Sequence, residues 1–322
     1  MLQPEYLSFP RQPESQDWCT VAPLDSAYVL RQVNGVFAFG DGLSIQDIPG
    51  WIKEADVVNS LDAPRKMILQ DSTKAFVATY QAASLGDPDP RWTGPKPRGK
   101  QDLAHEDISF AILSIWIVRP SQLGHRLYID GQRIGDKWQM RGLNLCESTL
   151  PLQRDVRVQV SRGDLELAGQ LYPAMKKIPR GGTMWTALRA YNMALSVQEW
   201  NLRYVLLWIG LEALFGPADG RKISFRLAKR MALFLKPTYP EAKAKFQIFK
   251  ELYSLRSKAV HGMRLQTLTA PVADAAIEDI DDALRISLGV ILRDSKLTDL
   301  FAGPEKAREQ YLDELVFGSS TS

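Results

Sequence analysis

The sequence predicts an α+β protein with two domains: a strand-rich antiparallel β domain over residues 1–180 and an all-α helical bundle over residues 181–322. Three observations support this prediction. Short β-branched and aromatic runs separated by turn residues dominate residues 27–175. Helical periodicity without a β pattern dominates from Thr183 onward. The segment KKIPRGG, residues 176–182, separates the two patterns and marks the expected domain boundary.

Several apolar runs in the first domain are expected to be strands. Asp130-Gly131 and Gly163-Asp164 are typical of tight hairpin turns, which favours antiparallel pairing. The expected strands lie within AYVLRQVNGVFAFG, KMILQD, AFVATYQAAS, FAILSIWIV, RLYIDGQRIG and VRVQVSRGDLELAGQLY.

The second domain is expected to contain six helices separated by glycine and proline. Gly216-Pro217 ends the second helix, Gly262 follows the fourth, and Gly303-Pro304 precedes the last. The expected helices span residues 184–197, 199–215, 221–235, 240–260, 272–294 and 304–316.

Composition excludes several classes of protein. Apolar residues make up 45% of the chain and charged residues 24%, which is typical of globular proteins. No apolar run is long enough to cross a membrane, and the N-terminus does not resemble a signal peptide, so a cytoplasmic protein is expected. Cys19 and Cys146 lack metal-like spacing, and no metal or cofactor is expected. The net charge of +3 permits a nucleic-acid partner without requiring one.

Arg256 occupies an unusual position on the expected helix 240–260. At about 100° per residue it falls in the middle of an apolar arc, between Phe249, Tyr253 and Val260. A guanidinium facing the core needs an anionic partner. The helix RYVLLWIGLEALF is apolar nearly all round, and Glu212 is its one acidic residue, so Glu212 is expected to lie near Arg256. A purely structural ion pair remains open as an alternative.

His261 follows Arg256 by five residues, at the expected end of the helix. Five residues correspond to about 140° of rotation, so one continuous helix would not direct both side chains to one point. The spacing alone is not specific, because His105 and His125 also follow an arginine, Arg98 and Arg119, at similar distances. The helical setting favours the third match.

Three motifs on successive expected helices resemble the Apea-like branch of the HEPN superfamily: WIGLEALFG, KISFRLAKRMALFL and FKELYSLRSKAVHG. The resemblance covers roughly residues 184–295, and ribonucleases of this superfamily carry an arginine followed after four to six residues by a histidine. Ser257 stands where Asn, Asp or His is commonest.

This resemblance implies a metal-independent endoribonuclease, acting as a toxin or antiviral defence effector, in which the 2′-hydroxyl of RNA attacks the adjacent phosphate. Arg256 and His261 would be catalytic, supported by Glu212 and Ser257, in a cleft formed by a homodimer of the helical domain. The first domain would respond to a trigger or inhibitor. The alternative is a non-catalytic HEPN module for dimerisation or for binding RNA or another partner.

A basic segment could contact the phosphates of RNA. Lys222, Arg226, Lys229 and Arg230 lie within ten residues that contain no acidic side chain, and three of them share one helical face. The alternative is a solvated helix face. His105 and His125 lack companions that would suggest zinc, so ordinary surface or turn positions are expected for both.

Overall fold

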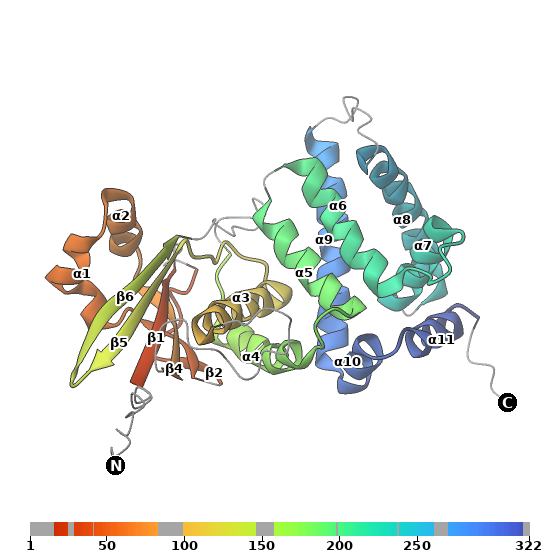
Figure 1. Ribbon diagram of the computed structural model, residues 1–322. Helices are drawn as coiled ribbons and strands as arrows, with labels where there is room; N and C mark the ends of the chain where they lie inside the picture. The colour runs from red at the N-terminus through yellow and green to blue at the C-terminus, as the bar shows by residue number, and fades with distance from the viewer. Residues whose placement is uncertain are drawn as a thin grey trace, which may run out of the picture. The chain divides into compact units, whose positions relative to one another are not determined.

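The computed structural model confirms the α+β class (Figure 1). A six-stranded antiparallel sheet forms from the N-terminal half of the chain, and the C-terminal half is helical. The structure describes residues 16–24, 29–40, 42–82, 99–145, 158–197, 199–236, 238–260 and 270–317.

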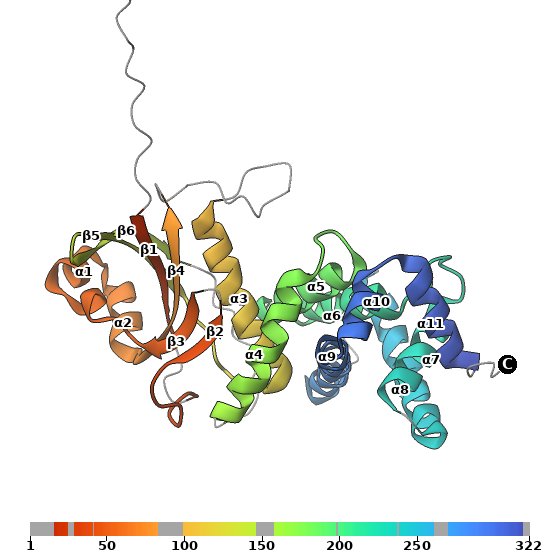
Figure 2. The same cartoon turned by 90° about the horizontal axis from the view of Figure 1, so that it is seen from below.

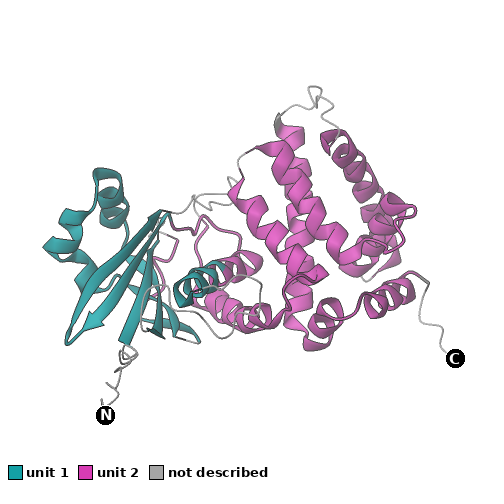
Figure 3. Ribbon diagram, viewed as in Figure 1, with its two compact units in different colours: residues 1–24, 35–109, 126–146 teal, residues 25–34, 110–125, 147–322 magenta. Residues whose placement is uncertain are grey.

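The chain divides into two compact units (Figure 3). Unit 1 comprises residues 1–24, 35–109 and 126–146, and unit 2 comprises residues 25–34, 110–125 and 147–322. The helical unit therefore begins well before the expected boundary at residues 176–182, and it also takes in two short segments from the first half of the chain.

The sheet of unit 1 has the strand order β2-β3-β4-β1-β5-β6, and every pairing in it is antiparallel, as expected. The strands are β1 (Gln16–Pro23), β2 (Phe37–Gly40), β3 (Leu43–Asp47), β4 (Lys74–Ala82), β5 (Leu127–Ile134) and β6 (Lys137–Leu145). Alternation along β1 and β5 directs Cys19 and Ile129 to one face, and Thr20 and Asp130 to the other.

Helical segments lie on both faces of this sheet (Figure 2). The face that carries Cys19 and Ile129 packs against Trp51, Ile52 and other apolar residues of the short helices that follow β3. These are the 3₁₀ helix η1 (Gly50–Lys53), α1 (Ala55–Ser60) and α2 (Ala63–Asp71). The opposite face meets the first turns of α3 (Lys100–Val118), from which Gln101 reaches Asp130.

Three of the expected strands are helices. KMILQD belongs to α2, FAILSIWIV belongs to α3, and most of VRVQVSRGDLELAGQLY forms α4 (Arg162–Lys177). The run in α3 is buried on almost every side, so it lacks the periodicity that separates a helix from a buried strand. In α4, Ser161 and Asp164 form a capping box, and the Gly163-Asp164 pair is therefore the first turn of a helix rather than a hairpin.

The Asp130-Gly131 pair is not a turn either. Both residues lie inside β5, at an irregularity in its pairing with β6, and the connection follows Ile134 instead, where Gly135 has φ 59°. Gly131 is required by close packing, because a Cβ atom there would lie 2.7 Å from the Trp51 ring. In the sequence, a glycine that is required by close packing cannot be distinguished from a glycine that is required by a turn.

The helices from Thr183 onward agree closely with the expected ones. The bounds are α5 (Thr183–Ser196), α6 (Trp200–Phe215), α7 (Ile223–Leu235), α8 (Tyr239–Val260), α9 (Ala270–Arg293), α10 (Ser295–Ala302) and α11 (Glu305–Phe317). The short helix α10 was not expected. Among the described residues, no helix is both long and apolar enough to cross a membrane.

Helix α6 is the central element of the bundle and packs against α5, α8 and α9. Tyr204 in α6 donates a hydrogen bond to the Leu252 carbonyl of α8 over 2.7 Å. At Gly210 the approach to α9 is so close that an added Cβ atom would lie 2.6 Å from Leu284 Cδ2. These contacts set the position of α6 relative to α8 and α9 within the unit.

Cys19 is expected to resist thiol reagents in the folded protein. Burial raises the pKa of its thiol to about 12, with a further increase from Asp130, so almost no thiolate forms at pH 8. A Cys146→Ser variant, which retains only Cys19, should react with Ellman's reagent only after urea is added. Rapid reaction of this variant without urea would show that the β1 thiol is accessible.

Candidate functional site

Arg256 lies on α8, at the side that packs against α6. Its side chain is 24% exposed, whereas Phe249 and Leu252 nearby on the same helix are buried. The guanidinium therefore stands at the edge of the core rather than within it. A cation at such an edge can be held by groups of the protein and still be reached by an anion from outside.

Glu212 of α6 is the partner of Arg256, as expected from the sequence. Arg256 Nη2 donates to Glu212 Oε2 over 3.1 Å, and the Tyr253 hydroxyl donates to Glu212 Oε1 over 2.9 Å. Burial and the negative charge of Glu212 raise the pKa of Tyr253 to about 12, so its hydroxyl remains a donor at neutral pH. Each oxygen of this carboxylate thus accepts a hydrogen bond from α8, and together these bonds orient Arg256.

The Arg256 guanidinium keeps unused donors. Its carbon lies 5.7 Å from the centre of the Tyr253 ring, and Nε is buried without a hydrogen-bond partner among the described residues. A guanidinium has five N–H groups in a planar arrangement that matches phosphate oxygens. One of these groups meets Glu212 and Nε is buried, so the other Nη donors of this partly exposed side chain are the ones suited to a second anion.

The two other residues expected at this site have different outcomes. Ser257 is exposed, one position along α8 from Arg256. His261 belongs to residues 261–269, which lie outside the described part of the chain. The pairing of Arg256 with Glu212 is therefore confirmed, and the pairing of Arg256 with His261 stays a prediction.

The basic residues of α7 are not equivalent. Lys222 is exposed and precedes the helix with φ 49°, and Arg226 Nη1 pairs with Asp219 over 2.6 Å. Lys229 is partly exposed. Arg230 is only 1% exposed, and its interactions with α11 are those of a core residue. We therefore withdraw Arg230 as an RNA-binding residue, while the other three remain candidates.

Arg230 is engaged by two carboxylates and one carbonyl. Its guanidinium binds both oxygens of Glu309 at 3.0 and 2.9 Å, Asp313 at 2.7 Å, and the Phe215 carbonyl at 3.1 Å. Burial opposes the charge, but the hydrogen bonds to Glu309 and Asp313 outweigh this effect and raise the pKa of Arg230. The residue holds α11 against α7 and the end of α6.

Neither of the other histidines is an ordinary surface or turn residue. His125 is buried, and His105 lies in α3, where its ring stacks on Tyr128 at a centroid distance of 3.9 Å. A helical setting therefore does not by itself distinguish His261 from His105. The contact between Arg256 and Glu212 is a stronger reason for selecting the C-terminal site.

Asp130 is the centre of a polar cluster in unit 1 that the sequence did not reveal. Its fully buried carboxylate accepts hydrogen bonds from Thr20 over 2.6 Å, Gln101 over 2.5 Å and Asn144 over 3.3 Å. His105 Nε2 lies 3.5 Å from the same carboxylate. An acidic residue directly after the apolar run RLYI could have been the signal, but the adjacent Gly131 favours a turn at this position.

Comparisons with known proteins found no counterpart: no protein-family profile, curated protein or solved structure matches the chain. Within the described residues, no group of three or more His, Cys, Asp or Glu side chains could hold a metal ion. The site around Arg256 is therefore interpreted from its own chemistry.

Proposed function

We propose that this protein is a metal-independent endoribonuclease of the HEPN type, with Arg256 and His261 as its catalytic residues. The observation that carries the proposal is that Arg256 is oriented by the protein and is still partly accessible. Its guanidinium is held at the edge of the core by a hydrogen bond from Nη2 to Glu212, and the side chain is still 24% exposed. An arginine that is oriented and still has donors to offer is suited to binding the phosphate at the point of cleavage.

The proposed reaction uses the 2′-hydroxyl of the RNA as its nucleophile. One imidazole accepts the 2′-proton, the 2′-oxygen bonds to the adjacent phosphorus, and the bond from phosphorus to the 5′-oxygen breaks. A second, protonated imidazole gives its proton to the departing 5′-oxygen. The products are a 2′,3′-cyclic phosphate and a 5′-hydroxyl end, and Arg256 stabilises the charge on the phosphate oxygens.

A homodimer of the helical domain would supply both imidazoles, one from each His261. Two copies would also remove the difficulty that Arg256 and His261 are about 140° apart on a continuous helix. We propose a toxin or antiviral defence effector as the biological role, with unit 1 responding to a trigger or inhibitor. Both of these roles follow from the family resemblance.

RNA cleavage by the full-length protein tests this proposal. Wild-type protein should cut a labelled RNA with or without EDTA, and His261→Ala and Arg256→Ala should each lower the rate by about 100-fold or more. Lys258→Ala changes an exposed residue between these two and is the matched control. The 3′ products should carry a 5′-hydroxyl that polynucleotide kinase can label without prior phosphatase.

A purely structural Arg256 predicts a different pattern. The closed contact among Glu212, Tyr253 and Arg256 also suits a non-catalytic module, in which the ion pair joins α6 to α8. In that case Arg256→Ala lowers the thermal unfolding temperature and no variant changes RNA integrity. Cleavage that persists in His261→Ala would likewise contradict the proposed base.

A further inference from the structure

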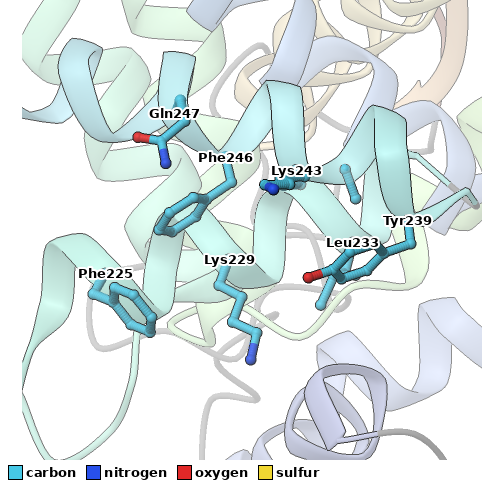
Figure 4. A pocket seen from close by; sticks show the side chains of 9 residues that line it. Phe225, Lys229, Leu233, Tyr239, Lys243, Phe246 and Gln247 are labelled. Atoms are coloured by element: carbon cyan, nitrogen blue, oxygen red, sulfur yellow. The ribbon is translucent and has the colours of Figure 1, made fainter.

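A groove lies between α7 and the first turns of α8, away from the contact between Arg256 and Glu212 (Figure 4). Its volume is about 300 Å³, which is large enough for one planar ring system. Its lining includes Phe225 and Lys229 of α7 and Tyr239, Lys243 and Phe246 of α8.

Three aromatic side chains, Phe225, Tyr239 and Phe246, line the groove. Tyr239 is 75% exposed and Phe225 is 48% exposed, which is unusual for large rings. Phe225 meets Phe246 edge to face at a centroid distance of 5.3 Å. In Figure 4 these two phenylalanines lie on one side of Lys229 and Tyr239 lies on the other. The rings therefore offer exposed surface on both sides of a basic side chain.

The charged side chains that line the groove are both lysines. Its lining includes Lys229 and Lys243 but no carboxylate, and Lys243 makes no ion pair within the described residues. Residues 221–250 contain nine of the chain's 40 basic residues and one of its 37 acidic residues. The rest of the chain is consequently net negative by five charges, so the basic character of the protein is concentrated on α7 and α8.

Part of this charge is already neutralised within unit 2. Arg226 and Arg230 meet Glu309 and Asp313, and Lys245 meets Asp279 at 3.3 Å. Lys243 is exposed and projects beside the rings. Exposed aromatic rings next to lysines are the combination that binds single-stranded nucleic acid, because rings stack on bases and ammonium groups neutralise phosphates.

We propose that the groove between α7 and α8 binds a base and a flanking phosphate of single-stranded RNA. Phe225 and Tyr239 stack on the base, and Lys243 contacts the phosphate. The helix rises about 25 Å from Tyr239 to Arg256, so the groove holds the substrate several nucleotides away from the proposed cleavage site. This inference rests on the proposed ribonuclease function and adds a substrate-binding site to it.

Binding to an uncleavable strand tests the groove separately from catalysis. A fluorescein-labelled, fully 2′-deoxy oligonucleotide has no 2′-hydroxyl nucleophile, so its anisotropy reports binding alone. Tyr239→Ala and Phe225→Ala should each weaken binding about tenfold, because one stacking contact is lost. Lys243→Ala should weaken binding and also reduce the slope of log affinity against log salt by about one.

Matched controls lie elsewhere in the helical unit. Lys258→Ala removes an exposed lysine near the other end of α8, and Met193→Ala removes an exposed apolar side chain of α5. Both variants should bind like wild type. Tyr239 is mostly exposed, so unchanged circular dichroism of Tyr239→Ala would attribute its weaker binding to the groove.

The outcomes separate the groove from the nuclease. Weaker binding by the groove variants supports the proposed RNA-binding site even if no RNA is cleaved. Absence of RNA cleavage would overturn the proposed nuclease activity alone. Equal binding by wild-type and groove variants overturns the groove, whatever the cleavage assay shows. The proposed RNA-binding site is also overturned if the wild-type protein binds neither this strand nor the corresponding RNA. A protein partner would then be the remaining candidate for the groove.

Discussion

Replacing Arg230 with alanine is expected to lower the free energy of unfolding by about 3 kcal/mol. The change leaves Glu309 without its two-point contact and removes the hydrogen bond to the Phe215 carbonyl. The estimate is at the low end for a buried ion pair, since Asp313 is half exposed and can regain water. Urea denaturation followed by circular dichroism measures the effect.

Arg226 provides a matched control for this prediction. It lies one turn away on α7 and faces the same carboxylates, but at 3.6 Å from Glu309 and 3.9 Å from Asp313, and it is more exposed. Arg226→Ala should therefore cost less than about 1 kcal/mol. If the two variants are equally stable, the contacts of Arg230 do not hold α11 in place.

Replacing Asp130 with alanine is the second change with a large expected effect, about 3 kcal/mol of unfolding free energy. The carboxylate is completely buried, and its loss leaves the Thr20 hydroxyl and the amide groups of Gln101 and Asn144 without their acceptor. The loss is costly at Thr20, because this residue is fully buried and water cannot replace its lost partner, whereas Asn144 is exposed and its amide can bond to water. Urea denaturation of the full-length chain measures this change too.

Two further variants show which property of Asp130 matters. Asp17→Ala changes a half-exposed carboxylate near the start of β1 and should alter stability by less than about 0.5 kcal/mol. Asp130→Asn keeps the shape but presents an amide donor to other donors, so it should be nearly as destabilising as Asp130→Ala. Wild-type stability in Asp130→Asn would mean that packing, and not hydrogen bonding, sets the contribution of this residue.

The sequence predicted the helices from Thr183 onward well because their apolar faces repeat at helical spacing and their ends carry glycine or proline. It failed for α3, where burial on almost every side removes that periodicity. In α4, a capping motif was mistaken for a turn. Both errors concern segments whose local pattern is shared by more than one structure.

In the candidate site, too, some interactions could be predicted from the sequence and others could not. Glu212 could be predicted as the partner of Arg256 because each is an isolated charge on an otherwise apolar helix face, and an ion pair follows from desolvation. Arg230 could not be recognised as buried, because its partners Glu309 and Asp313 are about 80 residues away in sequence and nothing local distinguishes it from Arg226. The role of Asp130 likewise depends on residues from distant strands and from α3.

Because α6 and α9 approach closely at Gly210, we expect the residues at positions 210 and 284 to change together in related sequences. A larger residue at position 210 requires the Leu284 side chain to shift or to be replaced by a smaller one, since the added Cβ atom would lie 2.6 Å from Leu284 Cδ2. Glu212 is two residues further along α6, so a bulky substitution at 210 alone would displace the carboxylate that orients Arg256. Selection that preserves the position of Arg256 on α8 would therefore also restrict which residues are tolerated at position 210 on α6.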